Sequence, residues 1–207
     1  MKRQIFIPTK EELELELKRE IYKQKYKKTL KSTIYTLIVV IAVSSLLSTL
    51  LFPVLEIYGS SMSGTLSEGD IVLSMRKSLF KKGDIIAFYH NNKILIKRVI
   101  GVPSDWINID EEGNVYVNNI LLEEPYVKEK MQGENDIEYP YQVPDDSYFV
   151  LGDDRSSSLD SRTNIIGTIK KENIIGKIIL RLWPISKVGI PNWHRRLYVR
   201  RYKIINK

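Results

Sequence analysis

The sequence predicts a mostly β domain that follows a single N-terminal membrane-spanning helix. Three observations support this fold class. A run of 24 residues without a charge extends from Ser32 to Leu55. After it, short apolar runs recur about every ten residues between polar turns, a spacing typical of sandwich and barrel domains. No segment beyond Leu55 has the apolar period of an amphipathic helix longer than a few turns.

The composition limits the possible function classes. The chain of 207 residues can hold one domain of about 150 residues with appendages. It contains no cysteine, which excludes thiol catalysis, disulfides and cysteine-ligated zinc. Its only histidines are His90 and His194, so a histidine-rich metal site is excluded as well, and we expect no metal or cofactor. The net charge is +7, but its distribution along the chain matters more than its size.

Residues 1–31 are predicted to form a basic cytoplasmic segment. Thr9 and Glu12 have the spacing of a capping box, which marks the start of a helix over residues 10–31. Three apolar residues then recur at intervals of four and share one helical face: Leu13, Leu17 and Ile21. Five lysines crowd the end of the segment: Lys23, Lys25, Lys27, Lys28 and Lys31.

Residues 32–55 are predicted to be a transmembrane anchor. As a helix, this run spans about 36 Å, enough to cross a hydrocarbon layer of about 30 Å. A cleaved signal peptide is the alternative, but its apolar region has about 7–15 residues and its basic leader is shorter. The lysine-rich flank places the N-terminus in the cytoplasm and residues 56–207 outside the cell, as a single-pass protein of the cell membrane.

The domain formed by residues 56–207 is predicted to contain strands separated by turns. The candidate strands are Ile71–Met75, Ile85–Tyr89, Ile94–Ile100, Val115–Val117, Tyr148–Leu151 and Ile174–Leu182. Turn signals such as Lys82–Gly83–Asp84 and Glu112–Gly113–Asn114 lie between them. Residues 122–147 are acidic and interrupted by prolines, so we expect an extended excursion there rather than part of the core.

Residues 59–70, GSSMSGTLSEGD, follow the predicted anchor closely and are rich in Gly and Ser. These residue types favour turns over helices and core strands. On its own, the stretch is compatible with a flexible linker, or with a loop that presents a serine hydroxyl beside backbone amides. A nucleophilic serine needs a base, so the second interpretation depends on the rest of the chain.

Lys97 is the candidate base. Neither histidine has a setting typical of a positioned base, since His90 lies in a polar turn and His194 in a basic tail. Lys97 instead lies within an apolar strand, where lysine is rare unless it snorkels, pairs or reacts. Burial would lower its pKa from about 10.4 towards 8 and allow it to accept a proton. A lysine pointing outward from a half-exposed strand is the alternative.

The signature loop, residues 152–162 with the sequence GDDRSSSLDSR, contains two Asp–Arg pairings within eleven residues. We expect carboxylate–guanidinium bonds inside the loop to fix its shape. Its serines could then orient a neighbouring amine.

These three stretches resemble, in this order, the conserved boxes of the type I signal peptidases. Gly59–Asp70 resembles the nucleophile box through Gly-Ser-Ser-Met-x-x-Thr-Leu, and Lys82–Asp105 resembles the strand pair that carries a lysine base. The signature loop resembles the last box of the family. Together they cover most of residues 56–183, and the ordered set is far more specific than any single box.

The resemblance implies roles for individual residues. Ser61 matches the nucleophile and Lys97 the general base, which acts as a neutral amine. Ser158 matches a serine whose hydroxyl bonds and orients the lysine. Asp160 and Arg162 match an ion pair that holds the signature loop against the site.

The resemblance also implies supporting residues, a fold and a reaction. Arg98 follows the base as it does in relatives, and Asp153 belongs to the signature loop. Gly59 stands where some relatives have a hydroxyl that adds to the oxyanion hole, so the Ser61 amide would be a main donor there. The implied fold is an antiparallel β domain whose apolar surface rests on the phospholipid bilayer. The implied reaction is endoproteolysis of exported preproteins that carry small residues before the cut.

Several positions depart from the family pattern. Gly64 replaces a proline, which should loosen the turn behind the nucleophile. Ser156 and Ser157 stand where relatives commonly carry Asp and Asn, and Asp154 occupies a position that is often Asn. Because Ser61, Lys97, Ser158 and Asp160 all match the family pattern, we expect an active enzyme with a narrowed or altered preference. A dedicated role in pilus assembly fits these departures, so pilin-type subunits are candidate partners.

Two other function classes remain open at this point. A peptidase-like assembly factor, which binds exported subunits with little or no catalysis, has only Gly64 in its favour. The self-cleaving repressors share a Ser-Lys dyad, but the anchor and the lack of a helix-turn-helix pattern disfavour them. The basic tail, residues 193–207, is compatible with contact to anionic lipid or with solvation, and we expect no nucleic acid.

Overall fold

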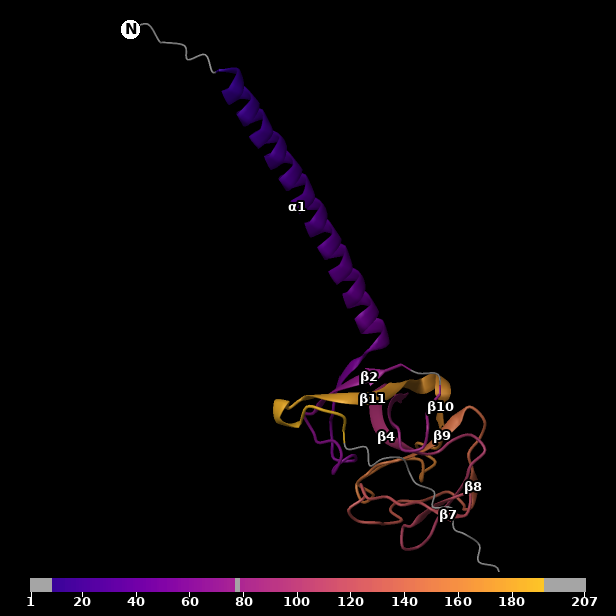
Figure 1. Ribbon diagram of the computed structural model, residues 1–207. Coiled ribbons are helices and arrows are strands. Elements are labelled where there is room, and N and C mark those ends of the chain that lie inside the picture. The colour runs from indigo at the N-terminus through magenta and orange to yellow at the C-terminus, as the bar shows by residue number, and fades with distance from the viewer. Residues whose placement is uncertain (1–8, 77–78, 192–207) are drawn as a thin grey trace, which may run out of the picture. The chain divides into compact units, whose positions relative to one another are not determined.

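A computed structural model describes residues 9–76 and 79–191 of the chain (Figure 1). The helix and the strands, in chain order, are α1 (Lys10–Leu51), β1 (Val54–Glu56), β2 (Ile71–Met75), β3 (Ile85–His90), β4 (Lys93–Gly101), β5 (Trp106–Ile109), β6 (Val115–Val117), β7 (Ile120–Leu121), β8 (Tyr141–Gln142), β9 (Ser147–Leu151), β10 (Ile169–Lys170) and β11 (Ile174–Trp183). Two short 3-10 helices, η1 (Lys171–Asn173) and η2 (Ile185–Lys187), flank β11. The chain divides into two units, residues 1–50 and residues 51–207.

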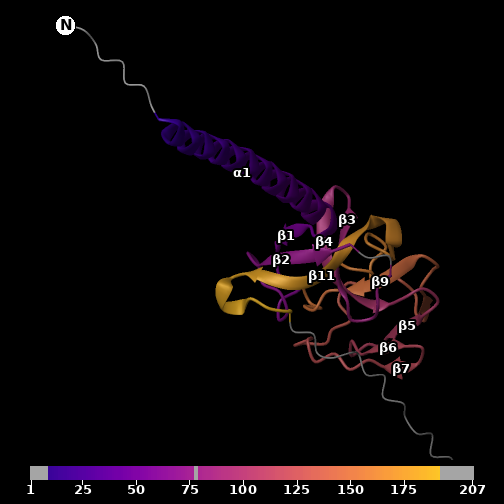
Figure 2. The ribbon, with the colours of Figure 1, turned by 45° about the horizontal axis from the view of Figure 1, so that its top comes forward.

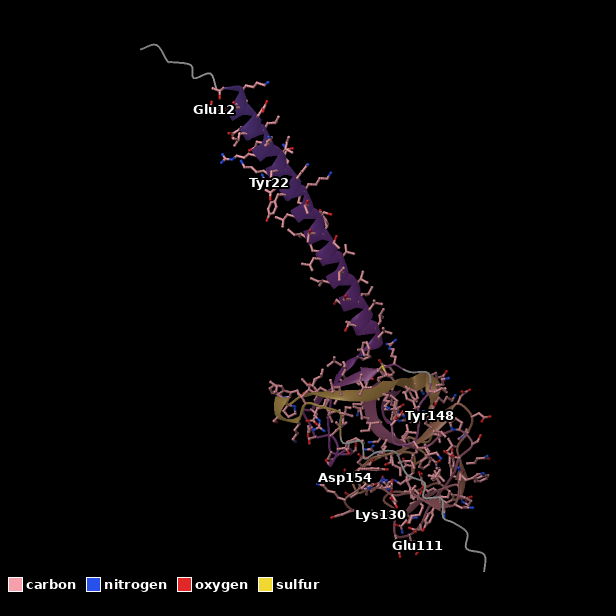
Figure 3. The ribbon with its side chains drawn as sticks, in the orientation of Figure 1. Glu12, Tyr22, Glu111, Lys130, Tyr148 and Asp154 are labelled. Atoms are coloured by element: carbon pink, nitrogen blue, oxygen red, sulfur yellow. The ribbon has the colours of Figure 1, made fainter. Side chains whose placement is uncertain are left out.

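Helix α1 is one continuous helix of 42 residues. It begins with the predicted capping box, in which the Thr9 amide donates to Glu12 Oε2 at 2.9 Å and the Glu12 amide donates to Thr9 Oγ1 at 3.4 Å. Figure 3 shows Glu12 at the start of the helix. The helix is long and apolar enough to cross a membrane, by length and composition. It ends at Leu51, before the predicted end of the anchor at Leu55, because Pro53 disfavours a helical conformation in the residue before it.

The second unit consists of two antiparallel sheets. The larger sheet has the strand order β1-β2-β11-β3-β4-β9-β10, and the smaller sheet has the order β7-β6-β5-β8. Figure 2 shows β5, β6 and β7 of the smaller sheet close to one another. This architecture confirms the prediction of a mostly β, antiparallel domain with one N-terminal apolar helix.

All six predicted strands are present, as β2, β3, β4, β6, β9 and β11. The prediction missed β1, β5, β7, β8 and β10. Four of these have only two or three residues. An alternating pattern needs about four residues or more to be recognised, so such short strands leave no signal of their own.

The apolar side chains of the β domain form three core clusters. One cluster joins the smaller sheet to β4 and β9, and it includes Leu122 and Val143. Both lie in residues 122–147, which were expected to form an excursion outside the core. That expectation is wrong for these positions. Prolines interrupt the regular hydrogen bonding of this segment, but they do not prevent its apolar side chains from being buried.

Strand β4 positions the site because it changes its pairing partner along its length. Residues 93–98 pair with β3, whereas pairing with β9 begins only at Arg98. Within the described ranges, residues 93–97 therefore have no strand partner on their second side. Strand β1 pairs with β2 alone and forms the opposite edge of the same sheet.

Candidate active site

Residues 60–66, which we refer to as the nucleophile turn, form a compact turn that contains Ser61, the predicted nucleophile. Its backbone amides donate to carbonyl oxygens within the turn at 2.7–3.1 Å, from Ser63 to Ser60, from Thr65 to Met62 and from Leu66 to Met62. The side chains of Met62 and Leu66 are buried in a core cluster with residues of β2, β3 and β11. Ser61 stays half-buried at the domain surface. The interpretation of this stretch as a flexible linker is therefore wrong.

The structure brings Ser61 and Lys97 into contact. Lys97 Nζ donates a hydrogen bond to Ser61 Oγ at 2.7 Å, although the residues lie 36 positions apart. The side chain comes from β4, where Lys97 pairs with Ile86 of β3. Lys97 is only 3% exposed, so it does not point outward into solvent as the alternative interpretation required.

Burial lowers the pKa of Lys97 from its ordinary value of 10.5 to about 8, because desolvation disfavours the ammonium. The carboxylate of Asp160 opposes this change and raises the pKa, the guanidinium of Arg162 lowers it, and Asp153 raises it. At pH 7, about a tenth of the molecules then carry the neutral amine. A serine hydroxyl bonded to such an amine can be deprotonated by it.

The signature loop contains one of its two predicted Asp–Arg pairings. Arg162 Nε donates to Asp160 Oδ1 at 2.8 Å, and Arg162 Nη2 donates to Asp160 Oδ2 at 3.0 Å. The Gly152 amide also donates to Asp160 Oδ2, at 3.0 Å. Arg162 Nη2 reaches the carbonyl oxygens of Arg155 and Ser158 at 3.0 and 3.1 Å. This buried pair therefore closes the loop on itself.

The other charged residues at the start of the loop pair outside it. Asp153 accepts hydrogen bonds from Arg98 Nε at 2.8 Å and Arg98 Nη2 at 2.6 Å. Arg155 pairs with Glu124, and both side chains are almost fully buried. The prediction of two Asp–Arg pairings within the loop is therefore wrong for Asp153 and Arg155. The loop packs into the domain, so its buried charges are satisfied by the elements around it.

Ser158 does not form the hydrogen bond that the resemblance implied. Its Oγ is buried and has no hydrogen-bond partner among the described residues, whereas Lys97 Nζ bonds Ser61. The reason is local packing. Ser158 Oγ lies directly against the backbone of Gly152, where any side chain at position 152 would overlap it. The expected Ser158–Lys97 bond is thus absent from this structure.

A groove of about 660 Å³ has Ser61 and Lys97 in its wall. Its two sides are the unpaired strand edges described above, residues 54–59 on one side and residues 92–97 on the other. Most of the lining is apolar: Val54, Leu55, Ile57, Ile94, Leu95 and Ile96. Gly59 also lines the groove, two positions before Ser61. The arrangement can hold an extended chain with its backbone next to the serine.

The described histidine takes no part in the site. His90 lies at the turn between β3 and β4, where its Nε2 and the Asn91 side chain are 3.1 Å apart. His194 and the basic tail lie outside the described residues. Within residues 9–76 and 79–191, no cluster of three or more His, Cys, Asp or Glu could hold a metal ion.

Comparison with known proteins identifies the family. Residues 30–183 match the family described as signal peptidase, peptidase S26. The chain belongs to this signal peptidase family.

Three curated relatives illustrate the similarity. Thylakoidal processing peptidase 1 of Arabidopsis thaliana is 34% identical over 161 residues, which cover 70% of this chain and 46% of that protein. The probable signal peptidase I-2 of Synechocystis is 35% identical, over 65% of this chain and 64% of the relative. Signal peptidase I of Bacillus amyloliquefaciens is 34% identical, over 67% of this chain and 80% of the relative.

The chain spans less than two thirds of the Arabidopsis and Synechocystis proteins. A crystal structure of a signal peptidase I from Enterococcus faecalis V583 is 29% identical, with a TM-score of 0.41, and covers 48% of this chain and 96% of that one. The comparisons give no support to the alternative of a non-catalytic assembly factor. The apolar helix and the bacterial signal peptidase relatives point to a membrane-anchored protein.

One departure from the signal peptidase pattern, Gly64 in place of proline, has a structural explanation. Its φ of +103° lies in the region that favours glycine, and a proline, fixed near −65°, cannot adopt it. The turn is nevertheless closed by its own hydrogen bonds. The expected loosening is therefore not seen, because the turn is closed by hydrogen bonds around a backbone conformation that glycine adopts readily.

The altered serines of the signature loop lie at the surface beside the nucleophile turn. Ser156 Oγ donates to Asp154 Oδ1 at 2.7 Å, and the hydroxyl oxygens of Ser157 and Ser60 are 3.2 Å apart. The Asp154 amide donates to the carbonyl oxygen of Ser61 at 3.1 Å, and Figure 3 shows where Asp154 lies in the domain. These departures leave the buried Asp160–Arg162 pair untouched.

Sequence reasoning missed four residues that contact the nucleophile turn or the signature loop. Thr65 donates to Asp153 Oδ2 at 2.5 Å, and Arg181 donates to the carbonyl oxygen of Thr65. A signal for Arg181 existed, since it is a charge within the apolar strand β11, as Lys97 is within β4. Glu124 and Tyr126 had no such signal, because they lie in the segment expected to be an excursion.

Proposed function

We propose that this chain is a membrane-bound serine endopeptidase that removes N-terminal signal peptides from exported preproteins, with Ser61 as nucleophile and Lys97 as general base. The observation that carries the proposal is the 2.7 Å hydrogen bond between the buried Lys97 amine and Ser61 Oγ. An unreactive serine hydroxyl becomes a nucleophile when a base of suitable pKa holds its proton. Membership of the signal peptidase family supports the substrate class.

The proposed reaction has two stages. In the first, Ser61 Oγ attacks the carbonyl carbon of the scissile bond while the neutral Lys97 amine takes the hydroxyl proton. The resulting ammonium gives that proton to the leaving nitrogen, so that the C–N bond breaks and the signal peptide stays as an ester on Ser61. In the second stage, Lys97 deprotonates a water, which hydrolyses the ester and restores the hydroxyl.

The remaining site residues have supporting roles in this proposal. The Ser61 amide contributes to the oxyanion hole, and Gly59 adds no hydroxyl there. Asp160 and Arg162 hold the signature loop beside Lys97. The buried Ser158 hydroxyl, which has no other hydrogen-bond partner in the described residues, is available to orient the amine.

The groove suggests how a preprotein binds. We propose that the residues before the cut add as an extended strand between the unpaired edges of β1 and β4, which supplies backbone hydrogen bonds regardless of sequence. The apolar lining near Ser61 then selects small side chains at the first and third positions before the cut. Pilin-type subunits remain a candidate class of substrate.

The proposed membrane arrangement follows from charge. Residues 1–31 lie in the cytoplasm, residues 32–51, the apolar part of α1, cross the phospholipid bilayer, and the catalytic domain that begins with β1 at Val54 lies outside. The lysines before the apolar run support this orientation, since cytoplasmic flanks of single spans are enriched in Lys and Arg.

Cleavage of a defined preprotein tests the proposed function. The full chain in phospholipid vesicles is expected to cut a preprotein with Ala at the first and third positions before the junction. A matched preprotein with Phe at the first position should be cut at least about 100-fold more slowly, because a bulky side chain misplaces the scissile carbonyl. N-terminal sequencing of the product gives the cut site. Absence of cleavage of the Ala preprotein, or equal cleavage of both, would contradict the proposal.

The pH dependence of cleavage tests the base. Because the pKa of Lys97 is lowered to about 8, the neutral form increases as the pH rises towards that value. We expect kcat/KM to rise about tenfold per pH unit between about pH 6 and 7.5 and to level off above about 8.5. A profile that levels off near pH 6.5 would indicate a different base.

A further inference from the structure

Tyr126 lies in the irregular segment between β7 and β8 and touches two charged pairs beneath the nucleophile turn. Its side chain is 9% exposed. The Cζ of Arg98 lies 4.0 Å from the centre of its ring, a distance at which cation–π attraction is favourable. The Tyr126 hydroxyl donates to Glu124 Oε1 at 2.8 Å. Burial raises the pKa of Tyr126 well above its ordinary value, so the hydroxyl keeps the proton that it donates.

The first charged pair, Arg98–Asp153, connects Tyr126 to the nucleophile turn. Arg98 directly follows Lys97 in β4. Besides its two bonds to Asp153, the guanidinium donates to the Gly83 carbonyl at 3.0 Å and to Thr65 Oγ1 at 3.2 Å. Acceptors thus surround the edge of the planar Arg98 guanidinium, and the Tyr126 ring covers one of its two faces. The direction of the Arg98 side chain is therefore fixed both by its hydrogen bonds and by the ring.

Two of the three acceptors of Arg98, Thr65 and Asp153, lead to Ser61. Thr65 closes the turn four residues after Ser61, and its hydroxyl donates to Asp153 Oδ2. The residue after Asp153 donates its amide to the carbonyl oxygen of Ser61 at 3.1 Å. A shift of the guanidinium would consequently move the nucleophile turn relative to β4, which carries the base.

The second charged pair, Arg155–Glu124, connects Tyr126 to the signature loop. Glu124 is 6% exposed, and its Oε1 accepts from both the Tyr126 hydroxyl and Arg155 Nη2. Arg155 Nε donates to the Gly152 carbonyl at 3.1 Å, and the Arg155 carbonyl accepts from Arg162. The charged side chains of the signature loop shift the pKa of Lys97. This loop is therefore held in place through Tyr126 as well.

We propose that Tyr126 is a positioning residue for the Ser61–Lys97 pair. Its ring holds Arg98 and hence the nucleophile turn, while its hydroxyl holds the signature loop through Glu124. Together the two contacts keep Ser61 Oγ at hydrogen-bond distance from Lys97 Nζ. This inference rests on the proposed function, in which that contact is the catalytic one. A tyrosine that only fills the core would affect folding stability alone.

Kinetic measurements on tyrosine variants distinguish a positioning role of Tyr126 from a role in core packing alone. Tyr126→Leu removes the ring and the hydroxyl, and Tyr126→Phe removes the hydroxyl alone. The matched control is Tyr148→Leu, since Tyr148 is also buried but packs edge-on against Phe80 in a core cluster that does not include Tyr126. Figure 3 shows where Tyr148 lies. Cleavage of the Ala preprotein is measured with the full chain in vesicles, at a temperature where each variant is folded, together with its melting temperature.

We expect Tyr126→Leu to lower kcat by about 10- to 100-fold with KM changed by less than about twofold, because the catalytic groups are displaced while the groove is intact. Tyr126→Phe should lower kcat by about three- to tenfold, since it keeps the ring contact. Tyr148→Leu should lower the melting temperature and leave kcat within about twofold. Equal kcat losses in the Tyr126→Leu and Tyr148→Leu variants, or no loss in Tyr126→Phe, would overturn the positioning role.

A second measurement needs no substrate. Displacement of Arg98 leaves the Asp153 charge less neutralised, and Asp153 raises the pKa of Lys97. The Lys97 side chain, titrated by NMR in the Tyr126→Leu variant, should therefore lose its proton at higher pH than in the parent. Failure of the parent to cleave preprotein would overturn the proposed function. An unchanged Lys97 titration would overturn the role of Tyr126, whichever way the cleavage assay comes out.

Discussion

Replacement of Ser61 by Ala is expected to lower kcat/KM for preprotein cleavage by at least about 10⁴-fold, the scale typical of losing a serine nucleophile. The hydroxyl is the atom that forms the ester, so no neighbouring group can take its part. The stability of the domain should hardly change, because the side chain is half-buried and removal of its oxygen creates little space. Rates of processing by vesicle-bound enzyme and thermal unfolding provide the two measurements.

Ser63→Ala is the matched control. Ser63 lies two residues further along the same turn and contributes its backbone amide to the turn, which the substitution keeps. We expect its kcat/KM to stay within about threefold of the parent. Cleavage by Ser61→Ala at a rate near that of Ser63→Ala would show that the nucleophile is another residue.

Replacement of Lys97 by Met is expected to lower kcat/KM by a similar amount, at least about 10⁴-fold, because removing the base of such a pair costs about as much as removing its nucleophile. Methionine fills most of the volume of the lysine stem, so the packing of β4 should be kept. The residual activity of Lys97→Met should be nearly independent of pH, so that its loss relative to the parent grows as the activity of the parent rises with pH.

The stability of Lys97→Met provides an independent check. The folded protein binds the Lys97 proton less tightly than the unfolded chain, since the folded pKa is about 8 and the ordinary value 10.5. At pH 7 the buried ammonium therefore lowers the free energy of unfolding, and that cost is relieved as the pH rises from about 8 to 10.5. Lys97→Met should be as stable as the parent at pH 7, or more stable, in chemical denaturation.

Lys170→Met serves as the control for both measurements on Lys97. Lys170 is exposed in β10, and its substitution should leave both activity and stability close to those of the parent. An inactive but unfolded Lys97→Met protein, beside a folded Lys170→Met, would mean that Lys97 has a structural role and not a chemical one.

The sequence predicted those parts of the fold and the site that depend on local pattern. The long strands β2, β3, β4 and β11 have four or more apolar residues between turn signals, and each was found. Thr9 and Glu12 predicted the helix start because a capping box is formed within four residues. Lys97 was identified because lysine within an apolar stretch of a strand is rare.

The remaining features depend on contacts between segments that are distant in sequence. Nothing near Arg155 indicates that its carboxylate partner is Glu124, 31 positions away. The proline-interrupted segment of Glu124 and Tyr126 has no strand or helix period, so its burial could not be inferred from pattern. The position of the Ser158 hydroxyl depends on its packing against Gly152, which only the folded loop defines.

In the proposed reaction Lys97 is the base of the site, which requires its amine to be neutral in a sizeable fraction of molecules near neutral pH. The most direct test is titration of the Lys97 side chain by NMR in the parent protein, assigned by its absence in Lys97→Met. The structure predicts that the pKa of Lys97 is about 8. A Lys97 that keeps its proton up to its ordinary value of 10.5 would contradict the account, because such an amine could not take the proton of Ser61 at neutral pH.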